Sequence, residues 1–166
     1  MSGRTATTRR AWNRVQDAIS RTPDGFPPLR PPAPQTAVRA LEEVMDARVP
    51  EALRALWDIH EGAYDVRAAD MRWDFMDGHG FIGLDEVRQI HAMFTEPLNQ
   101  GLYRGRWGRV WDPAWIPVTS RTDSTMYTSG YFVDPGGGVG SWNGDTLTET
   151  VHPTLAHYLH HVADRM

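Results

Sequence analysis

Apolar and polar positions follow their clearest pattern in residues 35–64, which read QTAVRALEEVMDARVPEALRALWDIHEGAY. In the first half of this stretch, apolar side chains recur at helical spacing with charged side chains between them, which predicts an amphipathic helix. The positions expected on its buried face are Val38, Leu41, Val44 and Met45.

The pair Val49–Pro50 interrupts that helix, because proline has no N–H group and keeps the preceding residue out of the helical region. Proline suits the first turn of a new helix, so we expect a second helix to start at Pro50. Gly62 can adopt the left-handed conformation that ends a helix. The side chains expected on the buried face of this second helix are Leu53, Leu56, Trp57 and His60.

The chain before this stretch predicts a tail, a helix and a connector. Residues 1–8 are expected to form a loose tail, and Thr7 or Thr8 can cap a helix that continues through Arg21. Residues 22–34 contain six prolines, which exclude a helix and favour an extended connector over the surface. The face of the N-terminal helix expected to be buried holds Trp12, Val15 and Ile19.

The chain after this stretch favours β-structure. Turn-forming sequences at 134–138 and 143–145 separate runs rich in β-branched and aromatic residues. The elements expected are a strand at 81–83, a helix at 85–97 capped by Asp85, strands at 115–119, 125–133, 139–143 and 147–151, and a last helix from Pro153. Together these elements predict a single α+β domain over residues 9–166, in which an antiparallel sheet packs against several helices.

Length and composition agree with one domain. The chain has 166 residues, a length that buries most of its apolar surface without disulfides. It has no cysteine, which excludes disulfides, thiolate nucleophiles and cysteine metal sites. The first residues lack the apolar core of a signal peptide, and no run approaches the length of a membrane span. We therefore expect a soluble cytoplasmic protein that does not bind a membrane.

Charge is spread unevenly along the chain, although the net charge is only −4. Residues 1–39 hold seven arginines against two aspartates, a balance of +5, whereas residues 58–86 hold eight acids against two arginines, a balance of −6. Such fields can steer a charged partner during association. Solvated faces that merely differ in sign would give the same composition.

The acidic stretch after Gly62 is the main candidate for function. Asp70, Asp74 and Asp77 would share a face in a helical turn, where paired carboxylates can act as general acid and base. Alternatively, these carboxylates and neighbouring aromatic side chains form a docking patch for a basic partner protein, or simply an acidic surface. The candidate partner-binding residues are Asp65, Asp70, Trp73, Asp74, Asp77 and His79.

Other patterns with possible chemistry are better explained by structure. His157 and His161 have the spacing of metal ligands, but helical angles turn them away from the predicted apolar face towards water, so we expect no metal site. Ser141 stands one position away from its place in a nucleophile elbow. No lysine follows the glycines at 136–138, so these predict a hairpin turn in place of a phosphate-binding loop. We expect no catalytic residue and no cofactor.

Residues 98–113 combine arginine with tryptophan, a composition that also occurs in nucleic-acid-binding proteins. The negative net charge opposes that interpretation, and arginines that pack on tryptophans need no ligand. We therefore expect no nucleic-acid partner. The tryptophans that are candidates for exposed anchors are Trp73, Trp107, Trp111 and Trp142.

The order of features in residues 35–64 resembles the SUKH superfamily, the domain of the yeast cell-wall-assembly regulator and of many bacterial immunity proteins. The family pattern is an acidic helix, a Leu-Pro break, a second helix and an Asn/Asp-Gly end, and here Val49 and Glu61 depart from it. The residues that carry the resemblance are Leu41-Glu42-Glu43, Val49-Pro50, Leu53, Leu56, Trp57 and Glu61-Gly62. Residues 115–118, 131–135 and the last helix also resemble the second half of these domains, so the resemblance spans roughly Trp12 to Ala163.

The resemblance implies a SUKH-like fold and a non-catalytic binding module. Family members commonly neutralise a toxin by docking on it, or act as adaptors in regulation. It therefore implies a protein partner, with a toxin domain that has a basic active site as the first candidate. The alternatives are a regulatory adaptor without a toxin partner and a small hydrolase that uses Asp70, Asp74 or Asp77. The sequence leaves the oligomeric state open.

Overall fold

The computed structural model of the chain describes residues 3–21, 27–64, 79–102, 111–123, 126–144 and 146–166, and only the backbone within 122–128. The helices of this part are α1 (Gly3–Ser20), α2 (Gln35–Met45), α3 (Glu51–Trp57), α4 (Leu84–Asn99) and α5 (Leu155–Arg165). The strands are β1 (Gly80–Phe81), β2 (Ile116–Asp123), β3 (Met126–Val133), β4 (Val139–Asn143) and β5 (Thr146–His152). They form one antiparallel sheet in the order β1-β2-β3-β4-β5, which confirms the expected α+β fold.

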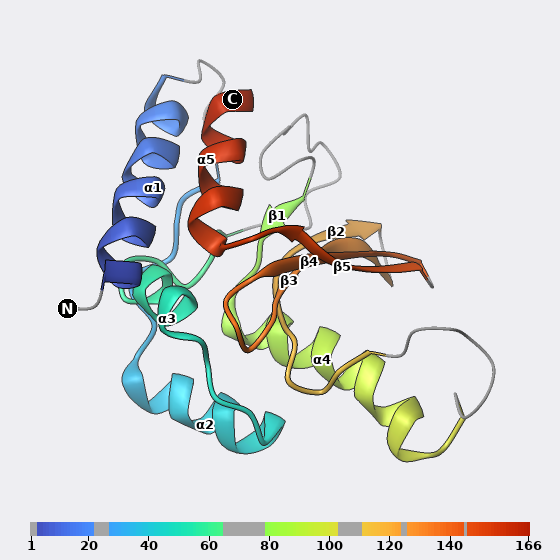
Figure 1. The fold of residues 1–166 in the computed structure, drawn as a ribbon. Helices are drawn as coiled ribbons and strands as arrows, with labels where there is room; N and C mark the ends of the chain where they lie inside the picture. Colours follow the sequence, from blue (N-terminus) through green and yellow to red (C-terminus); the bar gives the residue numbers. More distant parts are fainter. Residues whose placement is uncertain (1–2, 22–26, 65–78, 103–110, 124–125, 145) are drawn as a thin grey trace.

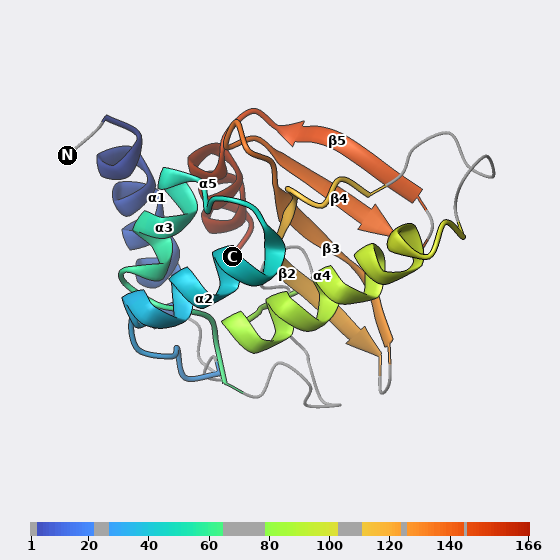
Figure 2. The same ribbon diagram turned by 90° about the horizontal axis from the view of Figure 1, so that it is seen from below.

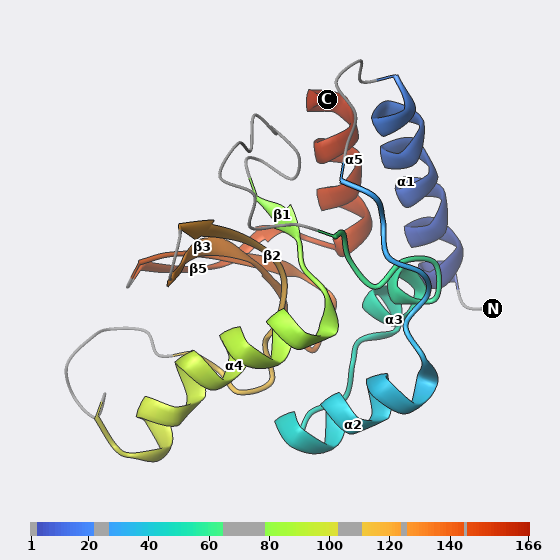
Figure 3. The same cartoon turned by 180° about the vertical axis from the view of Figure 1, so that it is seen from behind.

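The helices are arranged around the sheet in two groups. Helix α4 crosses one face of the sheet, as the view from below shows most clearly (Figures 1 and 2). Helices α1 and α5 lie side by side at one end of the sheet, with α3 packed against them (Figures 1 and 3). No helix of the described part is long and apolar enough to cross a membrane.

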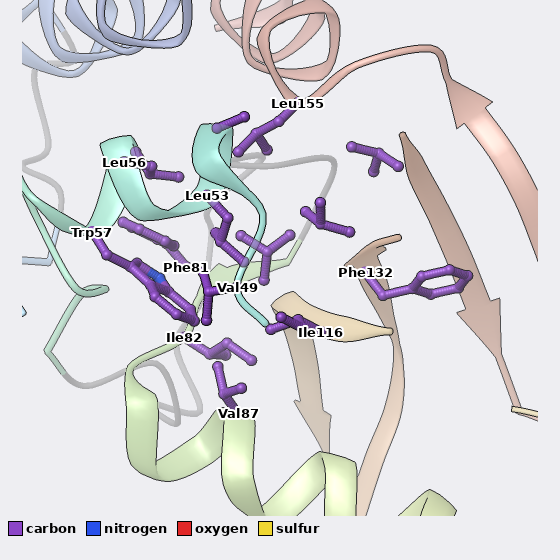
Figure 4. Close-up of a cluster of buried hydrophobic side chains, with 14 of the residues drawn as sticks. Val49, Leu53, Leu56, Trp57, Phe81, Ile82, Val87, Ile116, Phe132 and Leu155 are labelled. Atoms are coloured by element: carbon purple, nitrogen blue, oxygen red, sulfur yellow. The ribbon is translucent and has the colours of Figure 1, made fainter. Parts of the chain in front are cut away.

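The main core lies where α3 meets the first strands and the start of α4. Figure 4 shows side chains from these elements gathered between α3, β2 and α4. The buried side chains labelled there are Val49, Leu53, Leu56, Trp57, Phe81, Ile82, Val87, Ile116, Phe132 and Leu155, none of them more than 6% exposed. The apolar positions assigned to the second predicted helix therefore do form the scaffold, with the exception of His60.

Helix α2 follows its predicted apolar pattern with one error. Val38, Leu41 and Met45 are buried, but Val44 is 63% exposed. At 100° per residue Val44 lies about 120° around the helix from Val38, outside the narrow arc that the other three share. The helix ends at Asp46, which adopts the left-handed conformation with φ 48°.

Helix α3 is shorter than predicted, and this changes the roles of His60 and Gly62. The helix ends at Trp57, so His60 lies beyond it, and its Nδ1 donates a hydrogen bond of 2.7 Å to the carbonyl of Arg30. Gly62 does not close the helix. With φ 142°, it passes so close to Ile82 and Gly83 that a Cβ atom would lie 2.7 Å from their backbone atoms.

Helix boundaries differ from the sequence prediction at three other places. Helix α1 starts at Gly3, so residues 3–8 are helical where a tail was expected, and Thr8 is buried. Helix α4 is capped at Gly83, not at Asp85, and continues through Pro97. The last helix starts after Pro153, where the side chain of Thr154 accepts a hydrogen bond from the His157 N–H.

A second cluster of aromatic side chains fills the space between α4 and the sheet. Phe94 stacks on Trp111 at 4.4 Å between ring centroids, and Trp115 stacks on Phe132 at 4.2 Å. Trp111 and Trp142 are 4% and 2% exposed, so neither is the exposed anchor considered from the sequence. Trp73 and Trp107 lie outside the described residues.

Two strand glycines make room for this cluster. A Cβ atom on Gly130 would overlap the indole of Trp142, and one on Gly140 would overlap the ring of Phe132. Glycine has no Cβ, so each ring can lie flat over the neighbouring strand. The sequence therefore buries its large side chains on this face of the sheet by leaving the opposing positions empty.

The described part of the proline-rich connector, residues 27–34, is extended, as predicted. Leu29 forms an isolated antiparallel bridge with Ala63. The Arg30 N–H donates to the Gly62 carbonyl at 2.8 Å, and the Ala33 N–H donates to the Trp57 carbonyl at 2.8 Å. The connector is thus bonded along its length to the segment that follows α3.

Candidate functional site

Of the candidate partner-binding residues, the structure describes His79. Asp65, Asp70, Trp73, Asp74 and Asp77 lie outside the described residues, as do residues 103–110 of the arginine- and tryptophan-rich stretch. We name residues 65–78 the acidic segment. Tyr64 and His79, which flank it, are both described, so the structure shows which residues the chain contacts just before and just after the acidic segment.

The described stretches on either side of the acidic segment are bonded to each other. The Ala63 N–H donates a hydrogen bond of 2.8 Å to the Phe81 carbonyl, and Gly62 packs closely on Gly83. The Tyr64 N–H donates to the carbonyl of Pro28 at 2.9 Å, which adds the connector to the same junction. The segment therefore leaves the scaffold and returns to it at one place.

One arginine side chain holds this junction together. Arg30 lies with Nη2 3.1 Å from Glu86 Oε1 and with Nη1 3.7 Å from Glu61 Oε1. Its Nε donates to the Ala63 carbonyl at 3.1 Å, and its guanidinium lies 5.6 Å from the ring centre of Tyr64. A single planar guanidinium with several donors can contact several groups in this way.

Glu86 is fixed from two sides. One carboxylate oxygen contacts Arg30, and the other accepts a hydrogen bond of 3.1 Å from the Gly83 N–H at the start of α4. A carboxylate in the first turn also interacts favourably with the positive end of the helix. A Cβ atom on Gly83 would overlap the guanidinium of Arg30, so a larger residue there would displace Arg30 from this position.

Negative charge exceeds positive charge at this junction. Partial burial raises the pKa of Glu61, the guanidinium of Arg30 acts to lower it, and Asp85 and Glu86 raise it again, so the pKa lies above its usual range. Arg30 is shared between two carboxylates and does not compensate Glu61 completely. The junction is thus an electronegative base for an acidic segment.

The described contacts also reduce the charge counted from the sequence. Three arginines from outside residues 58–86 pair with acids inside it. The pairs are Arg9–Asp58 at 3.5 Å, Arg30 with Glu61 and Glu86, and Arg88–Asp85 at 3.8 Å. With these pairs the region has eight acids against five arginines, a balance of −3 in place of −6. The net charge of this region therefore stays negative but is half of the value counted from the sequence.

His79 attaches the far end of the acidic segment to the sheet. Its Nε2 lies 2.9 Å from the hydroxyl of Ser129, and its ring meets Tyr131 edge-on at 5.3 Å. Tyr131 in turn packs on Tyr158 of α5 at 4.7 Å. His79 is therefore a positioning residue within the described structure, whatever else it contacts.

Three further histidines gather where β5 ends and α5 begins. His152 is 7% exposed, and its Nδ1 lies 3.1 Å from Nδ1 of His157. The ring of His161 lies 5.1 Å from that of His152. The sequence prediction that His157 and His161 face water holds for His157, which is exposed, but His161 is half-buried. The sequence analysis missed the contacts that His152 makes with His157 and His161, because no local spacing links the end of a strand to the helix that follows it.

Other residues with possible chemistry have ordinary structural contacts. Among the described residues, no three histidines, aspartates or glutamates are placed to hold a metal ion. Asp164, which follows His161 by three residues on α5, pairs with Arg14 at 2.6 Å. The glycines at 136–138 form a hairpin turn closed by a hydrogen bond of 2.9 Å from the Asp134 N–H to the Gly138 carbonyl.

A cavity of about 360 Å³ lies between the starts of α1 and α3, the turn at 135–137 and the start of α5. The acidic side chain in its lining is Glu51, which accepts a hydrogen bond of 2.8 Å from Thr5. This cavity offers no pair of carboxylates for general acid–base catalysis. It therefore gives no support to the hydrolase alternative.

Comparison with known proteins adds no family to this description. No protein-family model matches the chain, and no curated protein matches it. The functional interpretation therefore depends on the residues and contacts described above.

Proposed function

We propose that this chain is a non-catalytic protein-binding module, and more specifically an immunity protein of the SUKH kind that docks on a cognate bacterial toxin. The observation that carries the proposal is the junction at Arg30. It holds both ends of an acidic, aromatic-containing segment at one point of a well-packed scaffold. Binding residues are commonly carried on loops positioned by a rigid scaffold.

The charge of the region supports a partner with a basic surface. The electronegative junction carries a segment with four aspartates against two arginines, and burial, followed by the nearby carboxylates of Asp85 and Glu86, raises the pKa of Glu61. A field of one sign accelerates association with a partner of opposite sign. A toxin whose active site is lined by basic residues would be captured quickly and occluded by the same contacts.

Trp73 is the proposed anchor of the interface. Aromatic side chains inside a polar rim contribute most of the binding free energy in many protein complexes. We expect Trp73→Ala to weaken binding about 30-fold or more, as for an anchor worth about 2 kcal/mol.

The proposal is tested by co-expression with the product of a neighbouring toxin-like gene. The wild-type chain should co-purify with that product and restore growth of cells that express it, whereas the Trp73→Ala variant should do both poorly. A matched control is Leu102→Ala, which removes another large apolar side chain that is 63% exposed at the end of α4. If wild-type protein neither binds nor protects, the immunity proposal fails.

The regulatory-adaptor alternative differs in its partner alone. It would be favoured if native co-purification recovered a protein that is not toxic and that still requires Trp73 for binding. The hydrolase alternative depends on Asp70, Asp74 and Asp77, which lie outside the described residues. It would be favoured if Asp→Asn substitutions at these positions removed a measurable hydrolytic activity without changing partner binding.

A further inference from the structure

The histidines at the junction of β5 and α5 form a cluster that the proposed function does not use. His152 ends β5, and His157 and His161 lie one turn apart on α5. The rings of His157 and His161 lie 5.3 and 5.1 Å from the ring of His152. His152 is thus the common neighbour of two imidazoles on consecutive turns of a helix.

The distance between two of the ring nitrogens is the central observation. Nδ1 of His152 lies 3.1 Å from Nδ1 of His157. Two imidazole nitrogens that bind one zinc ion at about 2.0–2.1 Å and stand 3.1 Å apart subtend about 100° at the metal, between the octahedral and tetrahedral values. The pair therefore already has the separation of two ligands of one ion.

The third histidine is near but not in place. As the described side chains stand, three groups do not converge on one point. His161 follows His157 by four residues on the same helix, which is the spacing at which two helical histidines share one ion. The ring of half-buried His161 lies 5.1 Å from that of His152.

We propose that His152 and His157 bind a divalent transition metal of the zinc class through their Nδ1 atoms, and that His161 completes a three-histidine site. Water would fill the remaining positions, since His157 is exposed. Neutral imidazole is a preferred ligand of Zn²⁺, Ni²⁺ and Cu²⁺. Such an ion would tie the end of the last strand to the last helix. This inference does not rest on the proposed docking function.

An ordinary hydrogen bond is the competing explanation of the 3.1 Å contact. In that case one neutral ring donates its Nδ1–H and the other accepts, and no ion is needed. Metal binding requires both Nδ1 atoms to be unprotonated, so each ring would carry its hydrogen on Nε2. With zinc added, metal binding therefore predicts that both rings carry their hydrogen on Nε2. The hydrogen-bond explanation predicts that one ring keeps its hydrogen on Nδ1.

The test is a zinc titration of the full chain by calorimetry at pH 7.5. We expect one Zn²⁺ per chain with a Kd of about 10 μM or tighter, weakened at least 30-fold by His157→Gln and by His152→Gln. His161→Gln should weaken it less, because His161 is not yet in place. His160→Gln is the matched control, since His160 lies on the same helix but contacts Arg14 at 2.9 Å, and it should change nothing.

Two further readouts separate a built site from surface binding. Zinc should raise the melting temperature of the wild-type chain by several degrees and leave that of His157→Gln unchanged, because an ion that binds the folded state stabilises it. Nitrogen-15 NMR should show both Nδ1 resonances shifted by zinc. His157 is exposed, so its variant folds even if the His152 variant does not. A millimolar Kd, or equal weakening by His160→Gln, would overturn the proposal.

Discussion

Two glutamates with the same exposure have opposite electrostatic environments. The side chains of Glu42, in the α2–α3 corner, and Glu61, at the base of the acidic segment, are each 20% exposed and each lie near one arginine. Burial acts to raise the pKa of both. Yet the pKa of Glu42 is lowered and that of Glu61 is raised.

The difference lies in burial, which is the largest cause of the raised pKa of Glu61, and in how many donors each carboxylate receives. Glu42 Oε1 contacts Arg54 at 2.6 Å and accepts a hydrogen bond of 2.9 Å from the Val49 N–H, and Arg48 adds a favourable charge. Glu61 has Arg30 at 3.7 Å, but Arg30 is closer to Glu86. One carboxylate is therefore satisfied within the fold, whereas the other keeps part of its charge uncompensated.

This comparison separates scaffold from candidate interface. In the α2–α3 corner, which carries the family-like motif, Glu42 is compensated by Arg54, Arg48 and the Val49 N–H, so this carboxylate stabilises the domain. The Arg30 junction is unbalanced, and its excess charge is available to a partner outside the chain. A protein can retain such a local cost where function requires it.

Removing Arg30 should have the largest effect on stability. Arg30→Met leaves Glu61 and Glu86 facing each other across a partly buried junction, and we expect a loss of about 2–4 kcal/mol in the free energy of unfolding. Urea denaturation measures this loss. The matched control is Arg88→Met, which breaks the exposed pair with Asp85 and should change stability by less than about 0.5 kcal/mol. Equal effects of the two variants would mean that Arg30 does not organise the junction.

Neutralising Glu42 should have the next largest effect. Glu42→Gln loses a charge-assisted contact with Arg54, and we expect a destabilisation of about 1–2 kcal/mol at pH 7. Because the folded state lowers the pKa of Glu42, its contribution is present above the ordinary value of 4.5 and is lost as the pH falls through the folded pKa. The difference between wild type and variant should therefore vanish in acid. A pH-independent difference would contradict the electrostatic explanation.

Neutralising Glu61 should have the smallest effect on the free energy of unfolding. It can stabilise the protein, whereas the other two substitutions destabilise it. The folded state raises the pKa of Glu61, so its favourable contribution is present below the unfolded pKa and is lost as the pH rises through the folded pKa. At pH 7 we expect Glu61→Gln to leave stability unchanged or to increase it by up to about 0.5 kcal/mol. A loss of more than about 1 kcal/mol, comparable with that of Glu42→Gln, would show that the two carboxylates do not differ.

Features that depend on neighbouring residues were predicted well from the sequence. The proline at position 50, the apolar spacing of α2 and α3, and the glycine-rich turn at 136–138 are local signals, and the structure contains each of them. The α+β fold followed from their order. Boundaries were less accurate, as at Gly3 and Trp57, where the helix ends depend on tertiary packing.

Contacts between distant residues could not be predicted in this way. Arg30 meets Glu86 across 56 positions of sequence, so nothing local marks it as the centre of the junction. Gly62 was interpreted as a helix end because a glycine signal does not distinguish a left-handed helix cap from a close approach to Gly83. The contact of His152 with His157 was overlooked because no helical or strand spacing links the end of β5 to α5. The SUKH resemblance and the partner-binding role of the acidic segment remain predictions.

The most direct test of the docking account is the association rate with the toxin-like partner at low and high salt. The account predicts that Asp→Asn at positions 65, 70, 74 and 77 together slows association at least 10-fold at low salt and little at high salt. The matched control removes four exposed carboxylates elsewhere, with Asp17→Asn, Glu43→Gln, Asp46→Asn and Glu96→Gln, and should slow association far less. An equal effect of both sets, or none from the first, would contradict it.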